Sequence, residues 1–325
     1  MTKTRIAIIG LGRIGGSIGL ALKRTKLDLE IVGHDKDFGT AGRAQKRGAV
    51  DKTNWNLIGA CEGAAMIILA LPLDGVKDTL AALKSYVQPG VIITDTAPTK
   101  APVLEWANDL PRGTQFVGGH PVLRFDRAAG GHGIDAADAT LFDRATYCLT
   151  PSVTADSNAV DTVANFARLL GAQPYFMDAI EHDGLAAGVE HLPALLATAL
   201  ASATTASQGW RELARLASVD FRVATELAPQ NEQSANEAFM AHRTDLIRWI
   251  DLIIEELRRQ RGILERHDNA ALKATIKAMV EKRDQWLSGK YEEAGIPTPP
   301  AESVSSTLGH FFVGGLAERG APKRK

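Results

Sequence analysis

RIAIIGLGRIGGSIGLALKRT, residues 5–25, is the stretch that decides the fold. Its first five residues form a short apolar run typical of a buried strand, and residues 17–25 have the length of a helix. Between them stands GLGRIG, a GxGxxG pattern placed where a strand must turn into a helix. This context predicts the opening βα turn of a domain that binds a dinucleotide.

The glycines of this turn have separate expected tasks. Gly10 permits the tight turn, Gly12 lets the backbone approach a pyrophosphate, and Gly15 lets helix and strand pack closely. The helix that follows presents free N–H groups and the positive end of its dipole to the phosphates. A glycine-rich turn without a ligand is the alternative interpretation. The predicted cofactor-binding residues of the turn are Gly10, Leu11, Gly12, Arg13, Ile14 and Gly15.

A carboxylate follows the second apolar run at the distance that a ribose-binding acid requires. Asp35 stands 20 residues after Gly15, where it can accept hydrogen bonds from the adenosine ribose hydroxyls. It should also repel a 2′-phosphate, so we expect NAD as the cofactor. Arg13 and Lys36 are close enough in sequence to offset that repulsion, which leaves NADP open.

Short apolar runs recur through the first half and alternate with helix-length segments. They predict an α/β Rossmann-type N-terminal domain whose parallel-rich sheet is covered on both faces. After about residue 181, segments with helical spacing replace the strands and predict an all-α C-terminal domain. We therefore divide the chain into a dinucleotide-binding domain (1–178), a helical substrate and dimerisation domain (179–290) and a tail or arm (291–325). The predicted strands are residues 5–9, 30–33, 65–71, 91–94, 115–117, 146–149 and 174–177.

Composition and charge exclude several classes of protein. The 37 basic and 38 acidic residues leave a formal charge of -1, and aromatic residues make up 6%, so no nucleic-acid partner is expected. The two cysteines, Cys61 and Cys148, lie far apart without a CxxC element, which argues against disulfides and a zinc site and fits a reducing cytoplasm. No stretch approaches the roughly 18 uncharged apolar residues of a membrane helix, so we expect a soluble protein with no membrane partner.

One helical segment is unusually rich in small residues. Residues 194–206 contain many Ala, Ser and Thr side chains, which let neighbouring backbones approach closely. We expect this segment to lie deep in a helical bundle or at a subunit contact. We also expect a homodimer formed through the helical domain.

Ligands of open α/β sheets bind at the carboxyl ends of the strands. Leu71 and Pro72 end one predicted core strand, and Thr96 stands at the end of the next, so we expect all three to flank the nicotinamide half of the cofactor. For Leu71 and Pro72, simple termination of the strand is the alternative.

Three histidines are candidates for the chemistry. His120, in GGHP (118–121), follows the run 115–117 and could take a proton from a substrate hydroxyl while hydride leaves the same carbon. A capping or core histidine is the alternative. His182 and His191, in HDGLAAGVEHLPA (182–194), would stand on similar faces of one helix about two and a half turns apart. We expect no metal there, because no third ligand accompanies the pair.

Four elements together carry a family resemblance: GLGxIGGS (10–17), GGHP (118–121), LTP (149–151) and HD…HLP (182–193), followed by the helical C-terminal half. They resemble the prephenate/arogenate dehydrogenase family of tyrosine biosynthesis over about residues 5–290, and GGHP and HD…HLP are the most specific of them. The resemblance implies oxidative decarboxylation of a small anionic substrate. NAD takes hydride from the ring carbon bearing the hydroxyl, a histidine accepts the hydroxyl proton, and loss of carboxylate makes the ring aromatic.

The same resemblance assigns roles to individual residues. His120 matches the base, and Arg222 matches an arginine that binds a substrate carboxylate. Asp126 occupies the place of an acid that pairs with this arginine in some relatives. A surface ion pair for Arg222 and a local ion pair for Asp126 are the alternatives. The expected substrate-binding residues are His182, His191, Arg222 and Asp126.

The sequence departs from the family pattern at two positions. Pro98 stands where relatives commonly carry a serine that orients the histidine and the nicotinamide, so Thr96 or Thr99 would have to supply the hydroxyl. We therefore place Thr99 beside His120 in the catalytic set. Ala194 stands where relatives commonly carry a second histidine that touches substrate. These departures keep two alternatives open: an NAD-dependent dehydrogenase of another small hydroxy acid, and a catalytically silent NAD-binding protein.

Overall fold

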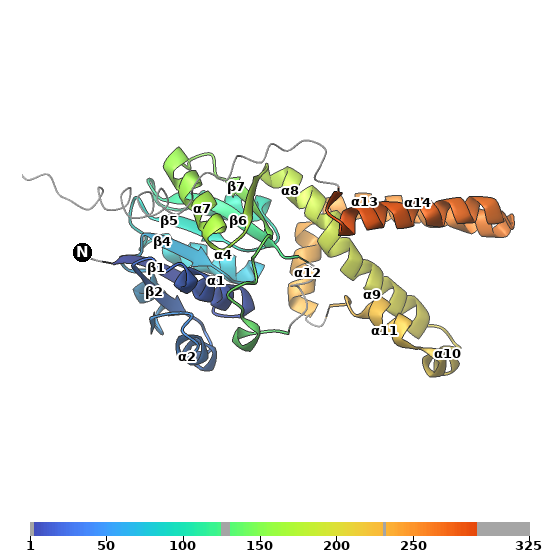
Figure 1. Ribbon diagram of the computed structural model, residues 1–325, viewed down its shortest axis with the longest axis horizontal. Helices are drawn as coiled ribbons and strands as arrows, with labels where there is room; N and C mark the ends of the chain where they lie inside the picture. The colour runs from blue at the N-terminus through green and yellow to red at the C-terminus, as the bar shows by residue number, and fades with distance from the viewer. Residues whose placement is uncertain (1–2, 125–130, 230–231, 291–325) are drawn as a thin grey trace, which may run out of the picture.

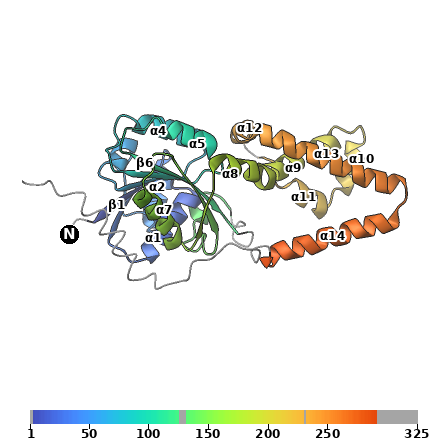
Figure 2. The same ribbon diagram turned by 90° about the horizontal axis from the view of Figure 1, so that it is seen from above.

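The computed structural model describes residues 3–124, 131–229 and 232–290. Figures 1 and 2 show a sheet flanked by helices at one end of the molecule and long helices that project away from it. The chain passes from the first part to the second between strand β8, Gln173–Phe176, and helix α8, Ala179–Ala186.

The sheet has eight strands in the order β3-β2-β1-β4-β5-β6-β7-β8. Every neighbouring pair is parallel except β6 and β7, which run antiparallel. The predicted Rossmann-type domain with a parallel-rich sheet, followed by a helical part, is therefore confirmed. The strands are β1 (Thr4–Ile9), β2 (Leu29–His34), β3 (Lys52–Thr53), β4 (Met66–Leu69), β5 (Ile92–Asp95), β6 (Gln115–Val122), β7 (Thr146–Pro151) and β8.

Helices pack on both faces of the sheet. In β1, Ile6 and Ile8 belong to one core with α1, α2 and α7, while Ala7 and Ile9 belong to a second core with α3, α4 and α5. This alternation is the period-two pattern of a strand buried on both sides. Where the structure describes this part, its α-helices are α1 (Arg13–Arg24), α2 (Phe38–Lys46), α3 (Leu57–Cys61), α4 (Leu73–Leu83), α5 (Ala101–Ala107) and α7 (Ser157–Leu169).

All seven predicted apolar runs form strands, but two details of the sheet were missed. β3 consists of two exposed residues and carries no apolar signal. β6 continues past residue 117 to Val122, because antiparallel β7 accompanies it after its pairing with β5 stops at Val117. His120 therefore lies within a strand, opposite Cys148, and not after the strand end as expected.

The two glycines before His120 explain both the geometry and the missed signal. They interrupt the apolar run, so the sequence pattern ends before the strand does. A Cβ atom at Gly118 would lie 2.4 Å from Thr150 Oγ1, and one at Gly119 would lie 2.7 Å from Asp95 O. Only glycine lets β7 and the end of β5 approach β6 this closely.

The helical part begins with one continuous helix, Ala179–Thr205, made of α8, a π turn at Ala187–His191 and α9 (Leu192–Thr205). Pro193 stands two residues after the end of the π turn; it has no N–H, so regular i→i−4 bonding is broken there. The other helices are α10 (Trp210–Leu216), α11 (Val219–Thr225), α12 (Glu232–Ala241), α13 (Arg243–Glu265) and α14 (Asn269–Leu287).

The helix Ala179–Thr205 corrects one expectation from composition. With 27 residues, most of them apolar, it is long and apolar enough to cross a membrane. One such helix is also what a core or interface helix of a protein outside the membrane presents. Its first half holds the buried polar side chains of His182 and Asp183, which pack against the sheet part of the chain.

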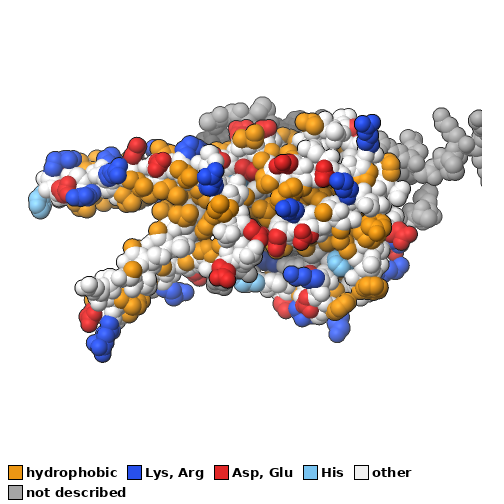
Figure 3. All heavy atoms as spheres, turned by 180° about the vertical axis from the view of Figure 1, so that it is seen from behind, with side chains coloured by type: hydrophobic (Ala, Val, Ile, Leu, Met, Phe, Trp, Pro, Cys, Tyr) orange, Lys and Arg blue, Asp and Glu red, His pale blue; other side chains and the backbone are white. Residues whose placement is uncertain are grey.

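The small-residue segment 194–206 does not lie deep in a bundle within this chain. Leu196 and Leu200 keep 36% and 39% of their surface exposed. Figure 3 shows two arms separated by an open notch, with apolar side chains along both. A subunit contact therefore remains as the expectation for this segment. The large exposed apolar residues of the arms include Leu196, Leu200, Leu213, Leu216, Val219, Val223, Leu257, Leu264, Ile276, Met279 and Val280.

Candidate active site

The glycine-rich turn between β1 and α1 has the shape that a pyrophosphate requires. Gly10 has a φ of 88°, and a Cβ there would lie 2.3 Å from Ala70 O, so only glycine fits the turn. Around Gly12 the space is open, with no described atom within 4 Å of a Cβ position. A Cβ at Gly15 would lie 1.9 Å from Gly10 O, which shows how closely the helix packs on the strand. These residues fit a dinucleotide phosphate group held at the N-terminus of α1.

Asp35 follows β2 and is held against the glycine-rich turn. Its Oδ2 accepts a hydrogen bond from the backbone N–H of Leu11 at 2.8 Å, and its Oδ1 accepts one from Asp37 N at 2.9 Å. The acid expected to bind the ribose therefore also fixes the conformation of the turn. Arg13 and Ile14 begin α1, and Ile14 packs against the core of the sheet part.

Three further predicted residues stand at the same edge of the sheet. Leu71 and Pro72 follow β4, and Pro72 is the N-cap of α4. Thr96 follows β5 and donates its N–H to Leu69 O at 3.1 Å. A Cβ at Gly10 would lie 2.8 Å from Leu71 Cδ2, so Leu71 borders the glycine-rich turn directly.

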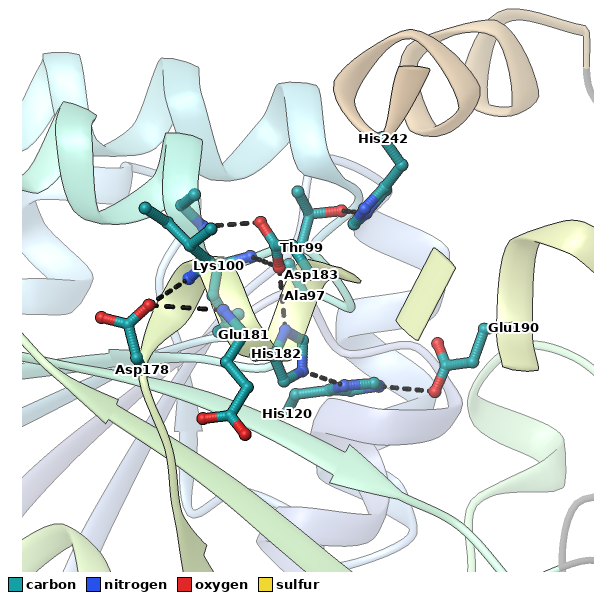
Figure 4. A network of polar contacts seen from close by, with 12 residues as sticks. Ala97, Thr99, Lys100, His120, Asp178, Glu181, His182, Asp183, Glu190 and His242 are labelled. Atoms are coloured by element: carbon teal, nitrogen blue, oxygen red, sulfur yellow. Dashed lines mark hydrogen bonds and ion pairs between the residues drawn. The ribbon is translucent and has the colours of Figure 1, made fainter. Parts of the chain in front are cut away.

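His120 is joined to the helical part by a chain of hydrogen bonds, shown in Figure 4. Its Nδ1 lies 2.9 Å from Nε2 of His182, and Nδ1 of His182 lies 2.8 Å from Oδ1 of Asp183. Asp183 also accepts hydrogen bonds from the backbone N–H groups of Lys100 at 2.7 Å and Ala101 at 2.8 Å. The chain therefore runs from β6 through α8 to the start of α5.

This chain defines which nitrogen of His120 carries the proton. Burial disfavours ionisation of Asp183, but the hydrogen bonds from His182 and the two backbone N–H groups outweigh it and lower the pKa of this carboxyl. An ionised carboxylate only accepts, so His182 donates from Nδ1, and in its neutral form its Nε2 accepts. His120 must then donate from Nδ1, which leaves a lone pair on its Nε2. Burial lowers the pKa of His120 well below its usual value and keeps the ring neutral.

A buried ion pair holds the backbone beside His120. Lys100 and Asp95 have no exposed side-chain surface and pair with each other, and Lys100 Nζ donates to Gly119 O at 2.8 Å. Asp95 also accepts from Gly119 N at 3.1 Å. Burial lowers the pKa of Lys100 although Asp95 opposes this shift. The pair holds both backbone groups of the residue before His120 and so fixes the strand that carries it.

Glu190 approaches His120 from the π turn. Its Oε1 lies 3.4 Å from His120 Nε2, the nitrogen to which the tautomer argument assigns the lone pair. Figure 4 shows the two side chains pointing toward one another. The Glu190 side chain is 30% exposed, whereas that of His120 is 8% exposed. Burial raises the pKa of Glu190 to about 7.

A second pair of histidines lies beside this group. The rings of His191 and His242 stack with centroids 4.3 Å apart, and His242 Nε2 lies 2.8 Å from Thr99 Oγ1. His191 Nε2 and His242 Nδ1 are buried and have no hydrogen-bond partner among residues 3–124, 131–229 and 232–290. Burial lowers the pKa of His191 to about 4 and also lowers that of His242.

The structure gathers only some of the predicted residues. His120, His182 and His191 meet at one site. His182 contacts His120, whereas His191 contacts His242. The expectation that His182 and His191 share a face was wrong, because residues nine apart on a regular helix lie on opposite faces. Thr99 is bonded to His242 and not to His120, contrary to our placement beside the base. Arg222 is exposed on α11, which packs on α9, and within the described part of the chain it forms no hydrogen bond or ion pair with the three histidines. Asp126 and the tail 291–325 lie outside the described residues.

Sequence reasoning missed five residues of the site: Asp95, Lys100, Asp183, Glu190 and His242. Asp183 stood next to His182 in the quoted motif, and an acid beside a histidine is the usual means of fixing its tautomer. Asp95 stood at the end of a core strand and Lys100 shortly after it, where a pair of opposite charges indicates a site. His242 gave no local signal, because its partner Thr99 lies 143 residues away.

Comparison with known proteins agrees with this architecture. A family model described as prephenate dehydrogenase, nucleotide-binding domain, matches residues 18–176, and one described as prephenate dehydrogenase, dimerization domain, matches residues 178–278. The chain is 32% identical over 290 residues to a prephenate dehydrogenase of Bacillus subtilis (strain 168), which covers 87% of this chain and 76% of that protein.

Solved structures show the same fold. An arogenate dehydrogenase of Synechocystis is 26% identical with a TM-score of 0.73, over 87% of this chain and 100% of that one. A prephenate dehydrogenase of Aquifex aeolicus, in complex with hydroxyphenyl propionate and NAD+, is 20% identical with a TM-score of 0.79, over 88% and 99%. The chain therefore belongs to the prephenate dehydrogenase family of oxidoreductases.

Proposed function

We propose that this protein oxidises and decarboxylates prephenate or arogenate with NAD, as a step of tyrosine biosynthesis, and that His120 is the base. The observation that carries this is the hydrogen-bonded chain from Asp183 through His182, which leaves a lone pair on His120 Nε2. Relatives named for these two substrates support the substrate class. Asp35, held at the glycine-rich turn, supports NAD over NADP.

The residues of the site fit the chemistry of such an oxidation. His120 Nε2 accepts the proton of the ring hydroxyl as the C–H bond of the same carbon breaks. NAD, when bound, supplies the acceptor for the hydride. Loss of the ring carboxylate as CO₂ then leaves an aromatic ring. Because burial keeps His120 neutral, the base is ready at neutral pH.

We assign His191 and His242 to the polar groups of the substrate. Their unpartnered nitrogens are buried, and a buried polar atom without a partner is costly unless a ligand supplies one. Together they could replace the contact that Ala194 cannot make. We retain Arg222 as a candidate for a substrate carboxylate within a dimer, because α11 packs on α9, whose exposed face we expect to meet the partner.

We further propose a homodimer in the cytoplasm, formed through the helical part. The dimerization description of the matching family model and the apolar residues exposed on both arms support it. The apolar character of the helix Ala179–Thr205 is then the character of an interface helix.

A steady-state assay with prephenate and arogenate, each with NAD and NADP, tests the function. We expect NADH formation with at least one substrate and a preference for NAD. His120→Asn should lower kcat by a factor on the order of 1,000 and leave the Kd for NAD within about twofold. Tight NAD binding without oxidation of either substrate would contradict the proposal.

Pro98, Ala194 and the exposed position of Arg222 on α11 favour one second candidate, a dehydrogenase of another small hydroxy acid. Turnover of other hydroxy acids, with neither prephenate nor arogenate oxidised, would select this candidate.

A further inference from the structure

Each oxidation leaves a proton on His120, and the site must release it before the next. On the Nδ1 side, the hydrogen-bonded chain open to the proton leads to His182 and Asp183, whose side chains are 3% and 10% exposed. This chain ends at the backbone N–H groups of Lys100 and Ala101, which donate hydrogen bonds and cannot accept a proton. On the Nε2 side it leads to Glu190, which is 30% exposed. Glu190 is thus placed between the buried base and solvent.

The π turn brings Glu190 to this position. At about 100° per residue, a regular helix would point residue 190 roughly 80° away from residue 182. The extra residue of a π turn changes the offset by about one residue step, to roughly 20°, so both side chains face His120. The indole Nε1–H of Trp249 in α13 donates a hydrogen bond to Gly184 O at 3.0 Å, and a Cβ at Gly188 would lie 2.5 Å from the same indole ring. The packing of α13 therefore fixes the π turn.

Within residues 3–124, 131–229 and 232–290, the ion-pair partner found for Glu190 is His120, and burial is the cause of the shift in the Glu190 pKa. The titratable groups that act on Glu190 or His120 are His120 on β6, Cys148 on β7, His182 and His191 on the same long helix, Lys100 before α5 and His242 before α13. Lys100 is already paired with Asp95. Burial raises the pKa of Glu190 to about 7, so the carboxyl can take up and release a proton near neutral pH.

We propose that Glu190 is the proton relay of the site, carrying the proton from His120 Nε2 to solvent after each oxidation. The substrate O–H bond breaks and a proton bonds to His120 Nε2. This N–H bond then breaks as an O–H bond forms at Glu190 Oε1, and the carboxylic acid gives its proton to water. When NAD is bound it accepts the hydride, the ring carboxylate leaves as CO₂ and the proton ends on water, so charge and atoms balance. This role rests on the proposed function.

Glu190→Gln tests the relay, because glutamine keeps the shape but cannot carry the proton. The first turnover, measured as one NADH per site in a stopped-flow burst, should proceed within about threefold of wild type. Steady-state kcat should fall on the order of 100-fold, and small carboxylate buffers such as acetate should restore it in proportion to their concentration. Glu181→Gln, an exposed acid one residue before His182, is the matched control and should behave as wild type.

Two outcomes would overturn the relay. One is an unchanged kcat in Glu190→Gln; the other is an equal loss in the first and later turnovers with no effect of acetate, which would show a role in binding or structure. A titration of the His120 ring by ¹⁵N NMR needs no turnover. The wild-type curve should contain a step near pH 7, where Glu190 titrates, and Glu190→Gln should lack this step. If neither substrate is oxidised, the proposed function fails, and this titration alone decides the relay: identical curves would reject it.

Discussion

His120 Nδ1 and His182 Nε2 lie 2.9 Å apart, and the two rings meet edge to face with centroids 5.1 Å apart. One ring comes from the sheet and the other from the helical part, so the base is oriented only when the two parts are packed together. Pro98 stands after β5, where the family resemblance implies a serine that orients the histidine, and proline offers no such donor. Here the orientation comes from the helix side instead.

Asp183→Asn should disrupt this orientation. Asparagine keeps one acceptor oxygen, but its NH₂ group cannot accept from Lys100 N, Ala101 N or His182. We expect kcat to fall on the order of 100-fold, and the free energy of unfolding to fall by about 1–3 kcal/mol. Kinetics and urea unfolding measure the two effects. Asp178→Asn caps the same helix equally well and should change neither. A wild-type kcat in Asp183→Asn would mean that this chain does not set the tautomer.

Acid should destabilise the protein through its buried histidines. Burial lowers the pKa of His191 from 6.5 to about 4. Between these values the unfolded chain binds a proton that the folded chain does not, so the free energy of unfolding falls as the pH falls through this window. The stability that the protein owes to a neutral His191 is fully present above pH 6.5 and is lost by about pH 4. In urea unfolding across this window, His191→Gln should show a shallower dependence on pH than wild type. Parallel curves would be evidence against a neutral, buried His191.

Asp35→Asn separates the two tasks of this residue. Asparagine can still accept the hydrogen bond from Leu11 N, so the glycine-rich turn should keep its conformation. It has no charge to repel a 2′-phosphate, and it binds the ribose hydroxyls less strongly than a carboxylate. We expect the KM for NAD to rise and that for NADP to fall, for a combined change in preference of about tenfold. An unchanged ratio of kcat/KM values for the two cofactors would place the ribose elsewhere.

Leu200→Glu should weaken the dimer. Leu200 is 39% exposed on α9, and a charge buried in an apolar contact is costly. We expect the Kd of the dimer to rise roughly 30-fold or more, as measured by analytical ultracentrifugation. Val153→Glu, at a side chain 97% exposed in the sheet part, is the control and should leave the Kd unchanged. Equal sedimentation of all three proteins would place the subunit contact on another face.

Features that depend on local sterics could be predicted from the sequence. Gly10 needs a φ of 88° and Gly15 must admit the strand, so the turn follows from the chemistry of a few adjacent residues. The extension of β6 depends on its pairing with β7, and the contact between Thr99 and His242 joins segments that share no pattern. The position of Glu190 depends on a π turn, a change of period that a helix-or-strand pattern does not register.

The helix Ala179–Thr205 spans 27 residues, with Glu190 near its middle and Leu200 toward its far end. One continuous helix therefore connects the candidate active site to the surface that we expect to meet the partner subunit. Linkage is reciprocal. If association of the subunits strengthens substrate binding by some free energy, substrate binding strengthens association by the same amount. Such a protein would sense its own concentration, since dilution that separates the subunits would also weaken its hold on substrate.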